Sequence, residues 1–241
     1  MGDYMAADDG PRETILRDMK YERIARSIGY DLVERAVARF LASPTRDQRI
    51  LTACAEALEA KRAEAASPRR RENLTYALRA LEAFMRSLNV LAISGLNLTA
   101  VPPFTRQPMV VEGVNINVKP SVNIRIIRPR GIDLVGACII DLAKGASAKT
   151  DAAQAKLTSA MEHSAALIHQ RASMTAREGE EKASPDHCIV FHAYRGERVC
   201  ASVAYKTKLR NIQAVCRVIA RGWDDVAPPP SFDQACATYR N

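Results

Sequence analysis

The chain has few aromatic side chains and no long apolar run. Phe, Trp and Tyr make up 5% of its 241 residues, which disfavours a platform that stacks single-stranded bases. No stretch approaches the roughly eighteen apolar residues of a membrane helix. The first twenty residues carry acidic side chains in place of a basic start and an apolar core, so we expect neither a secretory signal nor a membrane partner. We expect a cytoplasmic protein.

Several familiar site motifs are also missing. The sequence contains no G-x-S-x-G nucleophile elbow and no glycine-rich phosphate loop. Its six cysteines include no C-x-x-C pair, which favours buried thiols in a reducing compartment over a metal or disulfide framework. His163 and His169 fall on opposite sides of a predicted helix, and His187 and His192 belong to a predicted strand. None of the histidines has the spacing of a zinc site.

Positive charge is the chain's main compositional feature. The sequence has 35 Lys and Arg against 27 Asp and Glu, a formal net charge of +8. Neutralising phosphates with Lys and Arg is the main source of non-specific nucleic-acid affinity, so DNA or RNA is a candidate partner. A solvated basic surface without such a partner is the alternative.

The first part of the chain has the apolar period of helices. Apolar residues recur at three- and four-residue steps from Ile24 to Phe40, which predicts a helix that ends near Ser43 and Pro44. Thr45 is the candidate cap of a second helix. Ser67 and Pro68 mark the start of a third, as N-cap and first helical residue.

The middle of the chain alternates with the period of two expected for strands. Segments at 109–118, 122–126 and 132–144 predict adjacent antiparallel strands, with a turn at 128–131. A long helix is expected over 148–172, followed by a polar link over 178–185. Two short strands at 187–194 and 198–204 and a helix at 209–223 complete the pattern.

This order predicts an α/β fold with a mixed central sheet flanked by helices and an N-terminal helical region. We expect a flexible N-terminus at 1–18 and the helical region at 19–90. The α/β core is expected at 91–226, and a C-terminal tail at 227–241.

The candidate site lies at the end of the longest predicted strand. Asp141 and Lys144 close the apolar segment that begins after Gly131, and ionisable groups at a buried strand end are costly unless they are paired or bind a metal. Gln154 lies on the apolar face of the following helix. Capping, pairing with an arginine or exposure to solvent are the structural alternatives for these residues.

The order of elements, Val118-Lys-Pro-Ser121, Ile140-Asp-Leu-Ala-Lys-Gly145 and Gln154 resemble the PD-(D/E)xK phosphodiesterase superfamily over residues 70–225. The resemblance implies a Mg²⁺-dependent nuclease in which acids hold the metal and Lys144 activates water or stabilises the phosphorane. It makes Lys144, Asp141 and Gln154 the candidate catalytic residues. Asp141 is the candidate metal ligand, with Glu112 or Asp133 lending a second carboxylate.

Two positions depart from the family pattern. Ser121 stands where the first metal-binding Asp is expected, and Leu142 stands where the acid before Lys144 is expected. With regular alternation, Leu142 and Lys144 share one face of the strand and Asp141 lies on the other. A β-bulge near Leu142 would turn the Asp141 side chain to the face that carries Lys144. The pattern therefore favours a degenerate metal site.

The nucleic-acid contacts expected from the sequence are two basic clusters. Arg125, Arg128 and Arg130 crowd one turn, and Lys206, Lys208 and Arg210 open the last helix. Cations at a helix start oppose the helix dipole, which hints at an anionic partner. Three hypotheses follow: a nuclease-like accessory protein that binds nucleic acid, an active Mg²⁺-dependent DNA nuclease, and a structural or assembly protein with an acidic protein partner.

Overall fold

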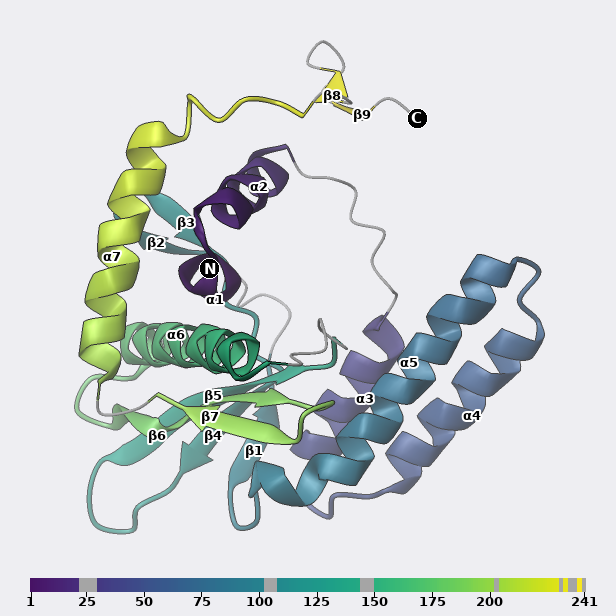
Figure 1. Cartoon of the computed structure of the whole chain (residues 1–241). Coiled ribbons are helices and arrows are strands. Elements are labelled where there is room, and N and C mark those ends of the chain that lie inside the picture. Colours follow the sequence, from purple (N-terminus) through teal and green to yellow (C-terminus); the bar gives the residue numbers. More distant parts are fainter. Residues whose placement is uncertain are drawn as a thin grey trace.

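The computed structural model describes residues 1–21, 30–101, 108–143, 150–201, 204–229, 232–233 and 238–239. They form a mixed α/β fold in which helices pack on both faces of a five-stranded sheet (Figure 1). The predicted α/β class, with a mixed central sheet flanked by helices, is confirmed. None of the helices in the described ranges has the length and apolar character needed to span a bilayer.

The central sheet has the order β1-β4-β5-β6-β7. Its strands are β1 (Asn97–Ala100), β4 (Val122–Ile126), β5 (Asp133–Asp141), β6 (Glu181–His192) and β7 (Glu197–Cys200). Neighbours are antiparallel except β5 and β6, which run parallel. The helix α6 (Asp151–Thr175) makes the crossover between these two strands, as a parallel connection requires.

A helical lobe precedes the sheet in sequence and covers one of its faces. It consists of α3 (Asp31–Ala42), α4 (Arg49–Ala63), α5 (Pro68–Ser87) and the 3-10 turn η1 (Leu88–Leu91). The start of α5 is as predicted: Pro68 is its first residue, and the Ser67 side chain accepts the N–H of Arg70 at 3.2 Å. Thr45 is not the cap of α4. Its hydroxyl lies 3.3 Å from that of Ser43, and Asp47 accepts the N–H of Arg49.

Alternation along the strands divides the apolar side chains between two cores. Ile140 and Leu142 belong to the core shared with α3, α4 and α5, whereas Ile139 packs into the core on the α6 side. The helix α7 (Tyr205–Gly222) lies beside α6 at the outer edge of the molecule (Figure 1). Its apolar face, with Ile212 and Cys216, joins the second core.

Residues 1–18, expected to be a flexible N-terminus, include the helix α1 (Gly2–Ala6) and most of the helix α2 (Asp9–Lys20). The helix α1 packs on α6 so closely that a Cβ on Gly2 would lie 2.4 Å from the Ser164 hydroxyl oxygen. At the end of α2, the Lys20 ammonium donates to the carbonyl oxygens of Trp223 and Asp224 at 2.6 and 3.0 Å. The few apolar residues of this segment, Met1 and Met5 among them, pack against the second core, and the flexibility of the segment stays a prediction.

Several further strands differ from expectation. The strands β2 (Met109–Val111) and β3 (Val114–Ile116) form a separate hairpin instead of joining the main sheet. The strand β1 was not predicted, and β6 begins at Glu181, inside the expected polar link. Within the expected C-terminal tail, β8 (Phe232–Asp233) and β9 (Thr238–Tyr239) make a short antiparallel pair. Whether a short segment forms a strand depends more on the segments that pack beside it than on its own composition.

The β5–β6 pair contains an irregularity opposite Gly136. Val135 pairs with Ala183 while Ala137 pairs with Cys188, so residues 184–187 bulge out of β6. A Cβ on Gly136 would lie 2.1 Å from the carbonyl oxygen of His187, a distance that no side chain tolerates. From Ala137 to Asp141 the register is regular. The irregularity therefore lies in β6 opposite Gly136, away from Leu142 after the end of β5.

Gly136→Ala is expected to destabilise the fold by about 3 kcal/mol or more, because the added methyl group must push the two strands apart. The measurement is the free energy of unfolding from denaturant titration. Gly10→Ala is the matched control, since no atom lies within 4 Å of its Cβ position in α2. It is expected to stabilise by up to about 1 kcal/mol. Equal effects of the two substitutions would contradict the close contact.

Candidate functional site

Asp141 is the last residue of β5 and is held by its own turn. Its Oδ1 accepts the N–H of Ala143 at 2.9 Å, and its carbonyl oxygen accepts the N–H of Ala193 at 2.9 Å. The neighbouring Ile140 and Leu142 point into the helical-lobe core. Lys144 lies outside the described residues, so its expected orientation opposite Asp141 stays a prediction. Asp141 acts here as a turn-capping residue.

A cleft of 680 Å³ opens beside this strand end, between α3, α6 and the ends of β4 and β5. Its ionisable side chains carry both signs. The acids are Asp3, Asp31, Glu34 and Asp141, and the bases are Arg35, Lys119 and Arg171. Within the described ranges, no three His, Cys, Asp or Glu side chains come close enough together to hold a metal ion.

Ser121, which replaces the expected metal-binding Asp, completes the β4–β5 pairing. Its hydroxyl oxygen accepts the N–H of Ile140 at 3.0 Å, and its own N–H donates to the carbonyl oxygen of Cys138 at 2.8 Å. These bonds satisfy backbone groups that would otherwise be unpaired at the end of β4. The serine at this position therefore has a structural role in the sheet.

Gln154 does not line the Asp141 cleft. Its Oε1 accepts a hydrogen bond from Arg195 Nη2 at 2.6 Å, and it borders a separate shallow hollow with Thr158 and Glu197. Thr158 donates to Glu197 at 2.7 Å, and Arg195 also forms an ion pair with Glu197. The glutamine is thus part of a polar network that joins α6 to the β6–β7 turn.

The two acids considered as additional metal ligands both bind arginines. Glu112 lies at the tip of the β2–β3 hairpin and accepts from Arg217 of α7 at 3.1 Å, which lowers the pKa of its carboxyl. Asp133 accepts the backbone N–H of Arg128 at 2.9 Å and the Arg125 guanidinium at 2.8 Å. These contacts lower the pKa of Asp133, the Arg128 N–H being the larger cause. Glu112 thus links the β2–β3 hairpin to α7, and Asp133 links the start of β5 to β4 and to the turn after β4.

Two residues near Asp141 escaped the sequence analysis as site candidates. Burial raises the pKa of the Tyr30 phenol, and the charge of Asp141 raises it further, so Tyr30 stays protonated and able to donate. His192 pairs in register with Asp141 and with Glu197, and its buried Nδ1 has no hydrogen-bond partner. The β5–β6 register places His192 beside Asp141, and no local motif signals this pairing.

The two predicted basic clusters have different surroundings. Arg125 lies in an ion-pair network with Asp133 and Glu181, while Arg128 and Arg130 are exposed in the β4–β5 turn. In α7, Lys208 pairs with Glu162 of α6 at 2.7 Å. Lys206 and Arg210 are exposed, and neither has a carboxylate partner within the described part of the chain.

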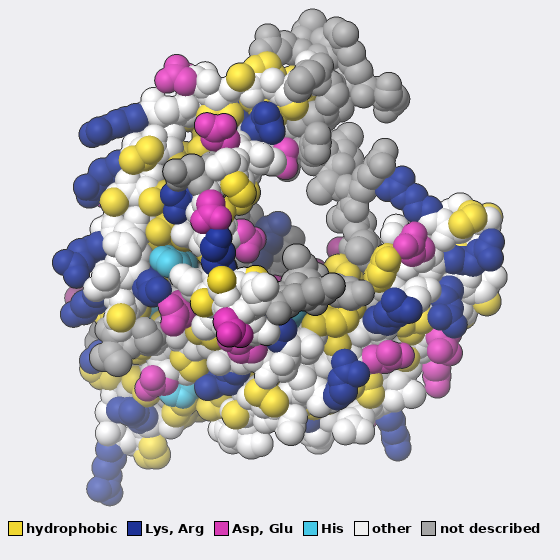
Figure 2. Space-filling view, in the orientation of Figure 1, with side chains coloured by type: hydrophobic (Ala, Val, Ile, Leu, Met, Phe, Trp, Pro, Cys, Tyr) yellow, Lys and Arg dark blue, Asp and Glu magenta, His cyan; other side chains and the backbone are white. Residues whose placement is uncertain are grey.

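Two arginines that the sequence analysis missed extend the second cluster along α7. Arg217 and Arg221 are exposed and share a helix face with Lys206 and Arg210, because the four residues are spaced at four, seven and four positions. The four residues, here called the α7 basic face, span about 23 Å. The helix contains no Asp or Glu. Figure 2 shows Lys and Arg side chains projecting along this edge of the molecule.

Mg²⁺ is expected to leave the thermal stability unchanged, because the described carboxylates near Asp141 do not form a metal-binding group. A site filled at about 100 times its Kd would add about 2.7 kcal/mol. The measurement is the unfolding temperature with Mg²⁺, with Ca²⁺ at equal ionic strength as the control. A rise with Mg²⁺ that Asp141→Asn abolishes would contradict the prediction.

Asp133→Asn is expected to lower the free energy of unfolding at pH 7. The difference in this free energy between the variant and the wild type should shrink as the pH falls from about 4 toward 2. The carboxyl has a lower pKa in the folded chain than in the unfolded chain, so its stabilising contribution is lost when it is protonated. Denaturant titrations across this pH range measure the effect. Glu178→Gln removes a carboxylate with no ion-pair partner among the described residues; an equal pH dependence there would contradict the assignment.

Comparison with known proteins adds no family to this picture. The chain matches no protein-family model and no curated protein. The resemblance to the PD-(D/E)xK superfamily consequently stays an expectation from element order and a few residues, and function is inferred from the described side chains.

Proposed function

We propose that the chain binds nucleic acid through the α7 basic face, as an accessory or binding protein. The observation that carries the proposal is the alignment of Lys206, Arg210, Arg217 and Arg221 on one exposed face of a helix that has no acidic residue. Its length of about 23 Å matches several successive phosphates of a duplex strand or groove edge.

The packing of α7 supports a pre-formed binding surface. Ile212, Cys216 and Ile219 are buried on the opposite face, so the helix cannot rotate its cations away from solvent. At its carboxyl end, carbonyl oxygens are held by Lys20 of α2. Cations displayed on a rigid element lose less conformational entropy on binding phosphate than cations on a loop.

The local electrostatics also favour an external anion. Arg217 has an acidic neighbour in Glu112 at 3.1 Å, and both side chains of this pair are partly exposed; ion pairs at the protein surface contribute little to stability. A polyanion gains by contacting all four cations together and releasing condensed counterions. Scattered surface arginines would not give this additive effect.

Non-catalytic binding fits the residues around Asp141 better than nuclease activity does. Ser121 and Gln154 have structural partners, and Asp133 and Glu112 bind arginines. The strand–strand–strand–helix–strand–strand order of β1, β4, β5, α6, β6 and β7 is compatible with a PD-(D/E)xK-like core, and we propose on this order a nuclease-like ancestry with an incomplete metal site.

The test is a triple substitution, Lys206→Gln, Arg210→Gln and Arg221→Gln, assayed by fluorescence anisotropy with a labelled duplex and a labelled single strand. Each phosphate contact contributes about −0.9 to the slope of log K against log salt on duplex DNA. The variant is expected to bind at least about tenfold more weakly, with a slope smaller by about 2 to 3.

The matched control removes three cations elsewhere. Arg69→Gln, Arg70→Gln and Arg71→Gln change the same net charge at the exposed start of α5 and are expected to alter binding little. Equal losses of nucleic-acid affinity in both variants would show that net charge alone sets the binding. Binding that is absent or insensitive to salt would favour the hypothesis of an acidic protein partner. Cleaved DNA in the presence of Mg²⁺ or Mn²⁺ would restore the nuclease hypothesis.

A further inference from the structure

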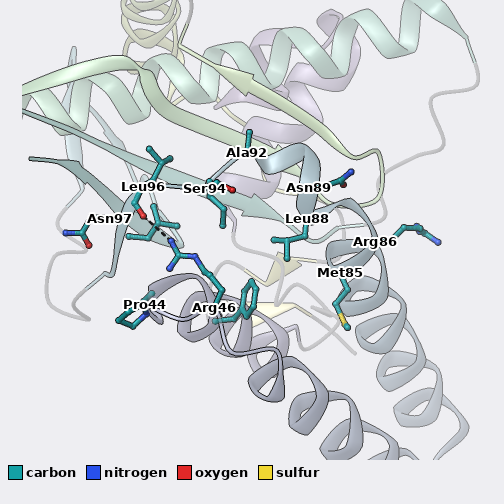
Figure 3. A pocket seen from close by; sticks show the side chains of 15 residues that line it. Pro44, Arg46, Met85, Arg86, Leu88, Asn89, Ala92, Ser94, Leu96 and Asn97 are labelled. Atoms are coloured by element: carbon teal, nitrogen blue, oxygen red, sulfur yellow. Dashed lines mark hydrogen bonds between the residues drawn. The ribbon is translucent and has the colours of Figure 1, made fainter.

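A pocket of 820 Å³ lies on the helical-lobe side of the molecule, far in sequence from α7. It is formed where α3 ends, where α5 passes into η1, and where the chain enters β1 (Figure 3). Its walls are mainly apolar, with Phe40, Met85, Leu88, Ile93, Leu96 and Leu98 among its lining residues. A volume of this size is in the range of small-molecule sites.

Arg46 brings a guanidinium to this apolar pocket. Its Nη1 donates to the carbonyl oxygen of Ser43 at 2.6 Å, and its Nη2 donates to that of Leu96 at 3.1 Å. Figure 3 shows the side chain reaching from the loop after α3 toward the strand entry. The two bonds fix the plane of the guanidinium between the lobe and the sheet.

The charge of Arg46 is not matched by a carboxylate within the described ranges. Carbonyl oxygens satisfy two of its five N–H groups and leave the positive charge in place. Burial lowers the pKa of this guanidinium, yet arginine stays charged at any physiological pH. Keeping a half-buried cation beside apolar walls costs free energy unless an anion pairs with it.

The backbone around the pocket is also unusual. Arg46 has φ 51° and Ala92, on the opposite side, has φ 50°. Non-glycine residues adopt this left-handed region rarely and at a cost, so surrounding contacts must enforce it. Arg46, one of these two residues at the pocket, is also the one whose side chain reaches toward Leu96 (Figure 3).

We propose that this pocket binds a small monocarboxylate with an apolar body, the carboxylate pairing with Arg46 and the body lying against the apolar walls. A planar guanidinium pairs most strongly with a two-oxygen anion. The single fixed cation matches one negative charge, so a polyphosphate would leave charge uncompensated. The Phe40, Leu88 and Leu98 walls favour an alkyl or aryl body over a sugar.

The test compares two ligands of the same shape, 4-butylbenzoate and its neutral amide 4-butylbenzamide, by isothermal titration calorimetry on the full chain. Wild type is expected to bind the carboxylate at least about tenfold more tightly, since a hydrogen bond to an ionised acceptor is roughly twice as strong as one between neutral groups. Amide NMR shifts should locate both ligands at Ser94, Gly95 and Leu96. Equal affinities, no binding, or shifts elsewhere in the chain would overturn the proposal.

Arg46→Met is expected to bind both ligands equally, because the apolar walls remain and the cation is lost. Arg86→Met is the matched control. Arg86 also borders the pocket but extends away from it in Figure 3, so the preference for the carboxylate should persist. A preference that survives Arg46→Met and disappears in Arg86→Met would overturn the assignment. Should Arg46→Met unfold, Arg46→Lys and the wild-type ligand pair still decide the outcome.

Discussion

The parallel contact between β5 and β6 at Gly136 supports every other part of the fold. The strand β5 approaches the carbonyl oxygen of His187 more closely than any Cβ allows, and the residues on either side of this contact pack into both apolar cores. The helical lobe rests on one face of the strand pair, and α6 with α7 on the other. Because both cores share these strands, a local expansion at Gly136 must disturb both.

The charged residues divide into two groups with different consequences. Arg125, Asp133, Arg177 and Glu181 neutralise one another at the starts of β5 and β6. This network joins β4, β5, β6 and the loop after α6. Lys206, Arg210 and Arg221 have no such partners within the described residues and face solvent on α7. A net charge of +8 alone does not distinguish the two groups, whose cations differ in having or lacking carboxylate partners among the described residues.

Part of the fold was predictable because its signals are local. The Ser67 cap, the α5 start, the alternation in β4 and β5 and their turn all depend on residues a few positions apart. The cap at Thr45 was wrong because Asp47 offers a competing acceptor nearer the helix. The β2–β3 segment alternates like a central strand, yet its pairing within a separate hairpin depends on α7, which comes about ninety residues later in the chain.

By itself the sequence determined the α/β class, the order of the elements from α3 to α5 and from β4 to α7, the positive charge and the departures at Ser121 and Leu142. These follow from period, composition and residue type at single positions. Only the tertiary structure decided that Ser121 closes a strand pair, that Gln154 binds Arg195, and that Arg46 borders an apolar pocket. Such pairings join residues far apart in the chain, and no local pattern encodes which distant side chain completes a hydrogen bond or neutralises a charge.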